Sequence, residues 1–148
     1  MILRTTPWIT EEAILIIESF LTHNENIIVL EFGSGGSTVW SAEKNVNIVS
    51  VEHDERWFDL IYYTLEKGGL LEKINYIFHP MPYYNVCSNF KDDSFDIIIV
   101  DGRNRKGCIL SAMSKSKSGG LLILNNSERP YYKEILPLLS EWNLIITE

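Results

Sequence analysis

The residue types with the clearest chemical meaning lie between Ile27 and Trp40, in the stretch IIVLEFGSGGSTVW. Apolar residues, a carboxylate at Glu31 and then glycines and hydroxyls predict a buried strand that passes through a tight turn into a helix. Gly33, Gly35 and Gly36 permit a ligand to approach the backbone closely, and the first N–H groups of the helix point toward it. An ordinary glycine-bearing turn is the alternative, because short glycine motifs also match by chance.

Polar residues also follow the other predicted strands. In chain order, the predicted strands are 27–31, 47–52, 74–79, 95–100, 120–124 and 144–147. Helical patterns lie between them at 11–23, 38–44, 54–67, 106–117 and 131–140, the last interrupted by Pro137. This alternation predicts an α/β protein with a doubly wound, mostly parallel sheet and helices on both faces. Ligands of such sheets bind at the carboxyl ends of the strands, so one crevice is expected there, lined by 31–38, 52–53, 79–84, 101–105 and 125–129.

Composition bounds the class of protein. With 148 residues, 45% of them hydrophobic, the chain is predicted to form a single domain, 1–148. A formal net charge of −7 argues against nucleic acid as a partner, because polyanions are repelled. No apolar run approaches the ~20 residues of a membrane span and no signal peptide is evident, so we expect a cytoplasmic protein without a membrane partner. Cys87 and Cys108 lack zinc-site or disulfide spacing and are predicted to be buried thiols.

Two carboxylates bear on the choice of cofactor. The dinucleotide fingerprint requires a third glycine where this chain has Thr38, which argues against NAD. Glu31 precedes the glycines and would face a pyrophosphate unfavourably, whereas it suits a cationic or amino-bearing ligand. Glu52 ends the second predicted strand, where it can accept hydrogen bonds from two ribose hydroxyls.

Four motifs carry a resemblance to a known family over nearly the whole chain: EFGSGGST at 31–38, VEHD at 51–54, FDIIIVDG at 95–102 and GGLLILNN at 119–126. In this order and spacing they resemble class I S-adenosylmethionine-dependent methyltransferases, whose Rossmann-like fold hosts many acceptors. The resemblance implies S-adenosylmethionine as the cofactor. It also implies that Glu31 and the loop Gly33-Ser34-Gly35 hold the methionine amino and carboxylate groups, that Glu52 holds the ribose, and that His53 lies against the adenine. Ser37 and Thr38 either bind the ligand or cap the helix.

The last two motifs resemble in particular the catechol-type O-methyltransferases, which bind a divalent ion through an Asp after the fourth strand and an Asp-Asn pair after the fifth. Asp101 and Asn126 match the outer positions, but Asn125 replaces the second Asp. The lost charge argues against magnesium. Without a metal, Asp101 would orient or deprotonate an acceptor hydroxyl, or it would only cap the following loop. The chain lacks the Asn-Pro-Pro-Tyr or Asp-Pro-Pro-Tyr motif of nucleic-acid amino methyltransferases, which favours O-methylation.

Basic residues follow the same strand ends. Arg103, Arg105 and Arg129, together with Asn126, are predicted to bind the acceptor, since arginine side chains clamp carboxylates or phosphates; a solvated loop is the alternative. The predicted function is therefore O-methylation of a small molecule that bears an anionic group. A catalytically inactive S-adenosylmethionine-binding subunit and a nucleotide-cofactor oxidoreductase are the alternatives. The family's seventh, antiparallel strand has no counterpart before Glu148. Three alternatives are expected: the sheet is built without this strand, its edge pairs with another subunit in a homo-oligomer, or the chain is cut before the strand.

Overall fold

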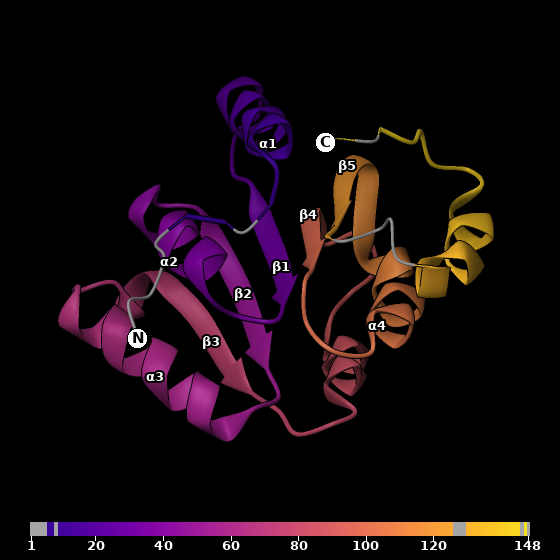
Figure 1. Ribbon diagram of the computed structural model, residues 1–148. Helices are drawn as coiled ribbons and strands as arrows, with labels where there is room; N and C mark the ends of the chain where they lie inside the picture. The colour runs from indigo at the N-terminus through magenta and orange to yellow at the C-terminus, as the bar shows by residue number, and fades with distance from the viewer. Residues whose placement is uncertain (1–5, 8, 126–129, 146, 148) are drawn as a thin grey trace.

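The fold is organised around a parallel sheet, which the computed structural model shows within residues 6–7, 9–125, 130–145 and 147, the part of the chain that it describes. The described residues form five strands in the order β3-β2-β1-β4-β5 (Figure 1). Their bounds are β1 (Ile28–Phe32), β2 (Asn47–Glu52), β3 (Ile74–Phe78), β4 (Phe95–Val100) and β5 (Ser116–Leu124). The predicted doubly wound α/β fold is confirmed. The order reverses between β1 and β4, so the expected crevice lies at the carboxyl ends of these two strands.

Helical segments cover both faces of the sheet. The helices are α1 (Glu11–His23), α2 (Gly36–Glu43), α3 (Glu55–Lys67) and α4 (Arg105–Ala112), and the shorter 3-10 segments are η1 (Leu71–Lys73), η2 (Tyr83–Asn89), η3 (Met113–Lys115), η4 (Pro130–Glu134) and η5 (Leu136–Leu139). Leu30 and Ile98 share a buried cluster with residues of η2 and α4 on one face. Val29 and Ile97 point to the opposite face, where they pack with Ile17 of α1. Alternate residues of the central strands are thus buried on both sides, as a parallel sheet requires.

The helix starts follow the predicted caps. The Thr10 side chain accepts a hydrogen bond from the N–H of Ala13 at 3.2 Å, and α1 begins at the next residue. Asp54 accepts from the N–H of Trp57 at 3.0 Å at the start of α3, which ends before Gly68. The boundaries of α1, β2 and β4 are as predicted, because capping side chains and apolar runs mark them locally.

The boundaries after β4 differ from the prediction. The helix expected at 106–117 ends at Ala112, and β5 begins at Ser116 instead of Gly120. The register against β4 shifts between Phe95 and Ile97, which pair with Ser116 and Leu121, so the start of β5 contains an irregularity that the apolar pattern does not reveal. Gly119, with φ of +80°, supplies the left-handed conformation at this point.

The C-terminal prediction is wrong in two respects. The helix expected at 131–140 is instead the pair of 3-10 segments η4 and η5. Pro137 has no N–H to donate, which prevents a continuous helix across it. The strand expected at 144–147 is not formed by residues 144, 145 and 147, the part of it that the structure describes. Within the described residues β5 is therefore an edge strand.

Two further expectations concern chemistry outside the sheet. Cys87 and Cys108 are free and buried, as predicted. Burial raises the pKa of Cys87 to about 11 and that of Cys108 to about 12, so both thiols are protonated at neutral pH. None of the described helices has the length and apolar character needed to cross a membrane.

Candidate functional site

The turn after β1 is the centre of the candidate site. Gly33 has φ of +91°, a conformation that residues with a side chain rarely adopt. A Cβ atom at Gly33 would lie 2.7 Å from the backbone nitrogen of Gly102 and 2.9 Å from the carbonyl carbon of Asp101. Glycine at this position therefore allows the turn after β1 to pack directly on the loop after β4, at the reversal of strand order.

Glu31 lies near the end of β1 and has no exposed surface. Its carboxyl oxygens accept hydrogen bonds from three hydroxyls, those of Ser37, Thr38 and Ser50, the last two at 2.5 and 2.7 Å. Burial raises the pKa of Glu31 from its usual 4.5 to about 7, against the lowering effect of these three donors. Because the carboxyl is fully buried, its predicted interaction with a ligand amino group would pass through the partly exposed Ser37.

Thr38 has one of the two roles that the sequence left open. Its hydroxyl oxygen accepts a hydrogen bond from the N–H of Gly35 at 3.0 Å at the start of α2, and the residue is fully buried. Thr38 therefore makes the cap contact, and its ligand-binding role stays a prediction. Gly36, the first residue of α2, is also buried, whereas Gly35 is partly exposed.

Glu52 ends β2 and is 4% exposed. Its Oε2 accepts from both the N–H and the hydroxyl of Ser34, each at 2.9 Å. Its Oε1 accepts from the N–H groups of His53 and Asp54, each at 3.2 Å. Glu52 thus holds the glycine turn and the segment after β2 together, and the hydroxyl of Ser34 occupies one of the positions that a ligand hydroxyl would need.

Ser34 is held by two aromatic side chains as well as by Glu52. Its hydroxyl lies 2.6 Å from the Tyr76 hydroxyl, and its carbonyl accepts from the indole N–H of Trp57 at 2.7 Å. A Cβ atom on the neighbouring Gly35 would be 3.9 Å from the Trp57 ring, so this ring lies beside the turn. The turn is therefore fixed from β2, β3 and α3 before any ligand binds.

Tyr83 links the loops that follow three strands. It is fully buried, and its ring contacts those of Phe32 and His53 edge to face, with centroids 5.4 and 5.0 Å apart. Its hydroxyl donates to the carbonyl of Arg103 at 2.7 Å. Burial raises the pKa of this hydroxyl, which keeps it protonated as a donor. A Cβ atom at Gly102 would overlap the Tyr83 hydroxyl, so a glycine is required there.

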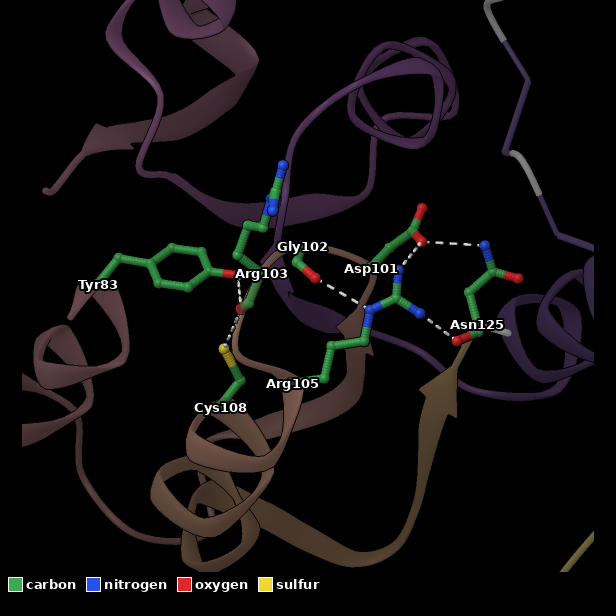
Figure 2. Close-up of polar contacts among 7 residues, drawn as sticks. All are labelled: Tyr83, Asp101, Gly102, Arg103, Arg105, Cys108 and Asn125. Atoms are coloured by element: carbon green, nitrogen blue, oxygen red, sulfur yellow. Dashed lines mark hydrogen bonds and ion pairs between the residues drawn. The ribbon is translucent and has the colours of Figure 1, made fainter. Parts of the chain in front are cut away.

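Asp101, Arg105 and Asn125 form a polar cluster at the carboxyl ends of β4 and β5 (Figure 2). The Arg105 guanidinium donates to the carbonyl of Gly102 at 2.9 Å, to the carbonyl of Asn125, and to Oδ1 of Asp101 at 3.3 Å. The side-chain amide of Asn125 donates to the same Oδ1 at 2.9 Å. Arg105 is 8% exposed, whereas the Asp101 side chain is 28% exposed. Asp101 and Asn125 are therefore both partly exposed, and Asp101 is the one of the two that carries a charge.

The predicted acceptor-binding arginines differ in their surroundings. Arg105 was expected to face the crevice, but its guanidinium is buried and hydrogen-bonded within the protein, because the residue begins α4 and turns back toward β5 (Figure 2). Arg103 lies in the preceding loop with an exposed side chain that points away from the cluster of Asp101, Arg105 and Asn125 (Figure 2). Asn126 and Arg129 lie outside the described residues.

Three residues of the site were not predicted, namely Ser50, Trp57 and Tyr76, and Tyr83 lies in the predicted crevice segment 79–84 without a role having been assigned to it. Ser50 interrupts an apolar strand and is fully buried, and such a buried hydroxyl must have a partner. The sequence therefore contained a signal for Ser50. Trp57 and Tyr83 carry no such signal, because an aromatic residue at either position is equally consistent with ordinary packing.

Comparison with known proteins supports the fold. No protein-family model and no curated protein matches the chain. Among solved structures, a caffeoyl-CoA O-methyltransferase-like protein from Staphylococcus aureus superposes with a TM-score of 0.68 and 14% identity, over 92% of this chain and 77% of the other. Precorrin-8w decarboxylase from Methanobacterium thermoautotrophicum gives a TM-score of 0.64 and 17% identity, over 92% and 75% of the two chains.

A third solved structure contains bound S-adenosyl-L-homocysteine. It is a SAM-dependent methyltransferase from Thiobacillus denitrificans in complex with S-adenosyl-L-homocysteine, with a TM-score of 0.55 and 16% identity over 77% of this chain. The present chain spans 47% of the length of that protein. These similarities show that the chain has the Rossmann-like α/β fold of S-adenosylmethionine-dependent methyltransferases. Because the fold also occurs in a protein described as a decarboxylase, cofactor and activity must be argued from the site.

Proposed function

We propose that the chain binds S-adenosylmethionine at the carboxyl ends of β1 and β2 and transfers its methyl group to an oxygen of a small-molecule acceptor. The observation that carries the proposal is the pair of buried carboxylates, Glu31 and Glu52, on either side of a glycine turn. They lie at the ends of adjacent strands, beside the reversal of strand order where ligands of this fold bind.

Glu52 suits the ribose of this cofactor. A ribose carries two adjacent hydroxyls, and a carboxylate at the end of the second strand is a suitable acceptor for both. One hydroxyl would displace the Ser34 hydroxyl from Oε2 of Glu52. The Ser34 hydroxyl would retain its contact with Tyr76 at 2.6 Å, so the exchange leaves no buried hydroxyl without a partner.

Glu31 suits the positive charge of the cofactor. S-adenosylmethionine carries an ammonium group and a sulfonium group, and both favour a nearby carboxylate in its charged form. The Ser37 hydroxyl donates to Glu31, and Ser37 is partly exposed whereas Glu31 is fully buried. A pyrophosphate at the same turn would bring negative charge close to both Glu31 and Glu52, which disfavours a dinucleotide.

Asp101 is the residue we assign to the acceptor. Bound S-adenosylmethionine supplies an electrophilic methyl group on its sulfonium. Asp101 would accept the proton of the acceptor hydroxyl as the acceptor oxygen takes up this methyl, and the electron pair of the broken carbon–sulfur bond would stay on sulfur. Positioning of the two reactants provides much of the rate, and the base contributes about 10²- to 10⁴-fold.

Arg103 is the described basic residue best placed for an anionic group on the acceptor. Its side chain is exposed and leaves the loop directly after Asp101 (Figure 2). Arg105, whose guanidinium binds Gly102, Asp101 and Asn125, is not assigned this role. Because the Arg103 side chain points away from Asp101, an acceptor that contacts both would carry its carboxylate or phosphate at a distance from the hydroxyl that is methylated.

Calorimetry with S-adenosylhomocysteine tests the assignment of Glu52. Glu52→Gln should weaken binding by about 10- to 100-fold, which corresponds to about 1.5–3 kcal/mol for hydrogen bonds to a charged group. Glu55→Gln, an exposed carboxylate in the first turn of α3, is the matched control and should bind as the unmodified protein does. Unchanged affinity of Glu52→Gln, in protein with an unchanged circular dichroism spectrum, would remove Glu52 from the site.

A further inference from the structure

The side chain of Arg105 is the least expected feature of the site. An arginine is rarely so buried unless acceptors surround its guanidinium, because an uncompensated charge is costly inside a protein. Here the acceptors come from two neighbouring strand ends: the carbonyl of Gly102 and the carboxylate of Asp101 after β4, and the carbonyl of Asn125 after β5. The guanidinium therefore joins the carboxyl ends of β4 and β5 as a fixed positive charge (Figure 2).

The same region is where the family resemblance predicts a divalent ion. A hard cation requires several oxygen ligands with enough negative charge to compensate for its dehydration. Of the described residues at the matched positions, Asp101 alone carries a negative charge, and Arg105 lies 3.3 Å from its Oδ1. The charge of Asp101 is thus already balanced. The side-chain amide of Asn125 also donates an N–H to this oxygen. Asn125 therefore turns a hydrogen-bond donor toward Asp101, whereas a metal site would need an oxygen ligand from Asn125 there.

The donor set at this place does not fit a metal ion. Within the described residues there is no group of three or more histidine, cysteine, aspartate or glutamate side chains able to hold one. A second cation at Oδ1 of Asp101 would have to displace the Arg105 guanidinium, which would then remain buried without its carboxylate.

We infer that the Arg105 guanidinium stands where a divalent ion would lie and performs the positioning task of that ion, so that Asp101 is oriented without a metal. Arg105 is thus a positioning residue: it acts on Asp101, and not on the acceptor itself. The role of Asp101 rests on the proposed methyl transfer, but the exclusion of a metal does not. Metal binding can therefore be tested in protein without any substrate.

The test is a titration with Mn²⁺, followed by electron paramagnetic resonance of the free ion. The unmodified protein should show no stoichiometric site up to about 1 mM Mn²⁺, the weak end of the range of protein sites for hard divalent ions. Asn125→Asp alone should also gain none, because Arg105 is adjacent to both carboxylates and balances the added charge. The double variant Asn125→Asp, Arg105→Gln should bind Mn²⁺ at least roughly tenfold more tightly than Asn125→Asp, the scale expected for groups that control a metal ligand.

Lys106→Gln in the Asn125→Asp background is the matched control. It removes the same charge from the same helix, but the side chain of Lys106 is 40% exposed and pairs with Glu134. Tighter Mn²⁺ binding only when Arg105 is changed supports the inference, and an equal gain in the Lys106→Gln control overturns it. If Arg105→Gln does not fold, Asn125→Asp decides: absence of a metal site supports the inference. Stoichiometric binding of Mn²⁺ to Asn125→Asp overturns the inference. Stoichiometric binding of Mn²⁺ to the unmodified protein that disappears in Asp101→Asn also overturns it.

Discussion

Replacing the buried carboxyl of Glu31 by an amide should change how the stability of the protein depends on pH. The folded-state pKa of about 7 lies above the usual 4.5 because the group is fully buried. Between these two values the folded chain keeps a proton on Glu31 that the unfolded chain has lost. Stability therefore falls as the pH rises through this window, and no further change is expected above about pH 8.

The magnitude follows from the two pKa values. Each pKa unit corresponds to about 1.4 kcal/mol, so the rise from 4.5 to about 7 corresponds to about 3 kcal/mol of unfolding free energy lost across the window. Glu31→Gln removes the titrating group and keeps the shape. The hydroxyls of Ser37, Thr38 and Ser50 can each donate or accept, so they can adapt to the amide.

The assay is urea unfolding of the unmodified protein and of Glu31→Gln at pH 4.5, 6 and 8. The difference in unfolding free energy between the two should shift by about 3 kcal/mol in favour of the amide from the lowest to the highest pH. Glu55→Gln, an exposed carboxyl, is the control and should show no such shift. If Glu31→Gln followed the unmodified protein in parallel at all three values, burial would not be raising this pKa and the reasoning would be refuted.

Three other substitutions separate the roles assigned to the site. Ser34→Ala frees Oε2 of Glu52 and should tighten S-adenosylhomocysteine binding by about 2- to 10-fold, the scale of one hydrogen bond, in calorimetry; weaker binding would place this hydroxyl on the ligand. Tyr83→Phe leaves the carbonyl of Arg103 without its 2.7 Å donor and should cost about 1–3 kcal/mol in urea unfolding; an unchanged stability would show that this bond contributes nothing. Asp101→Asn should lower turnover of an identified acceptor by ~10²-fold or more at unchanged S-adenosylmethionine affinity, whereas joint loss of affinity and melting temperature would make Asp101 structural.

Most of the fold could be predicted because its signals are local. Thr10 and Asp54 cap the helices that the sequence assigns to them, and the apolar run of β4 identifies a central parallel strand. The start of β5 and the C-terminal segment were predicted incorrectly. There the structure depends on a register shift against β4 and on the interruption at Pro137, which apolar periodicity does not encode.

The candidate site was less predictable than the fold. The strand-end positions of Glu31, Glu52 and Asp101 follow from the alternation of strands and helices. The burial of the Arg105 side chain cannot be predicted in this way. A run of basic residues after a strand does not indicate which of them begins the next helix and which remains in the loop. Arg103 and Arg105 are two positions apart, yet one is exposed and the other buried.

The most direct test of the account is calorimetric titration of the unmodified protein with S-adenosylmethionine and, separately, with NAD. The carboxylates Glu31 and Glu52 at the glycine turn predict saturable binding of S-adenosylmethionine with one site per chain, and no measurable binding of NAD at the same concentrations. Binding of NAD that is as tight or tighter, or no binding of S-adenosylmethionine, would contradict the central claim that this turn receives a cationic, amino-bearing cofactor.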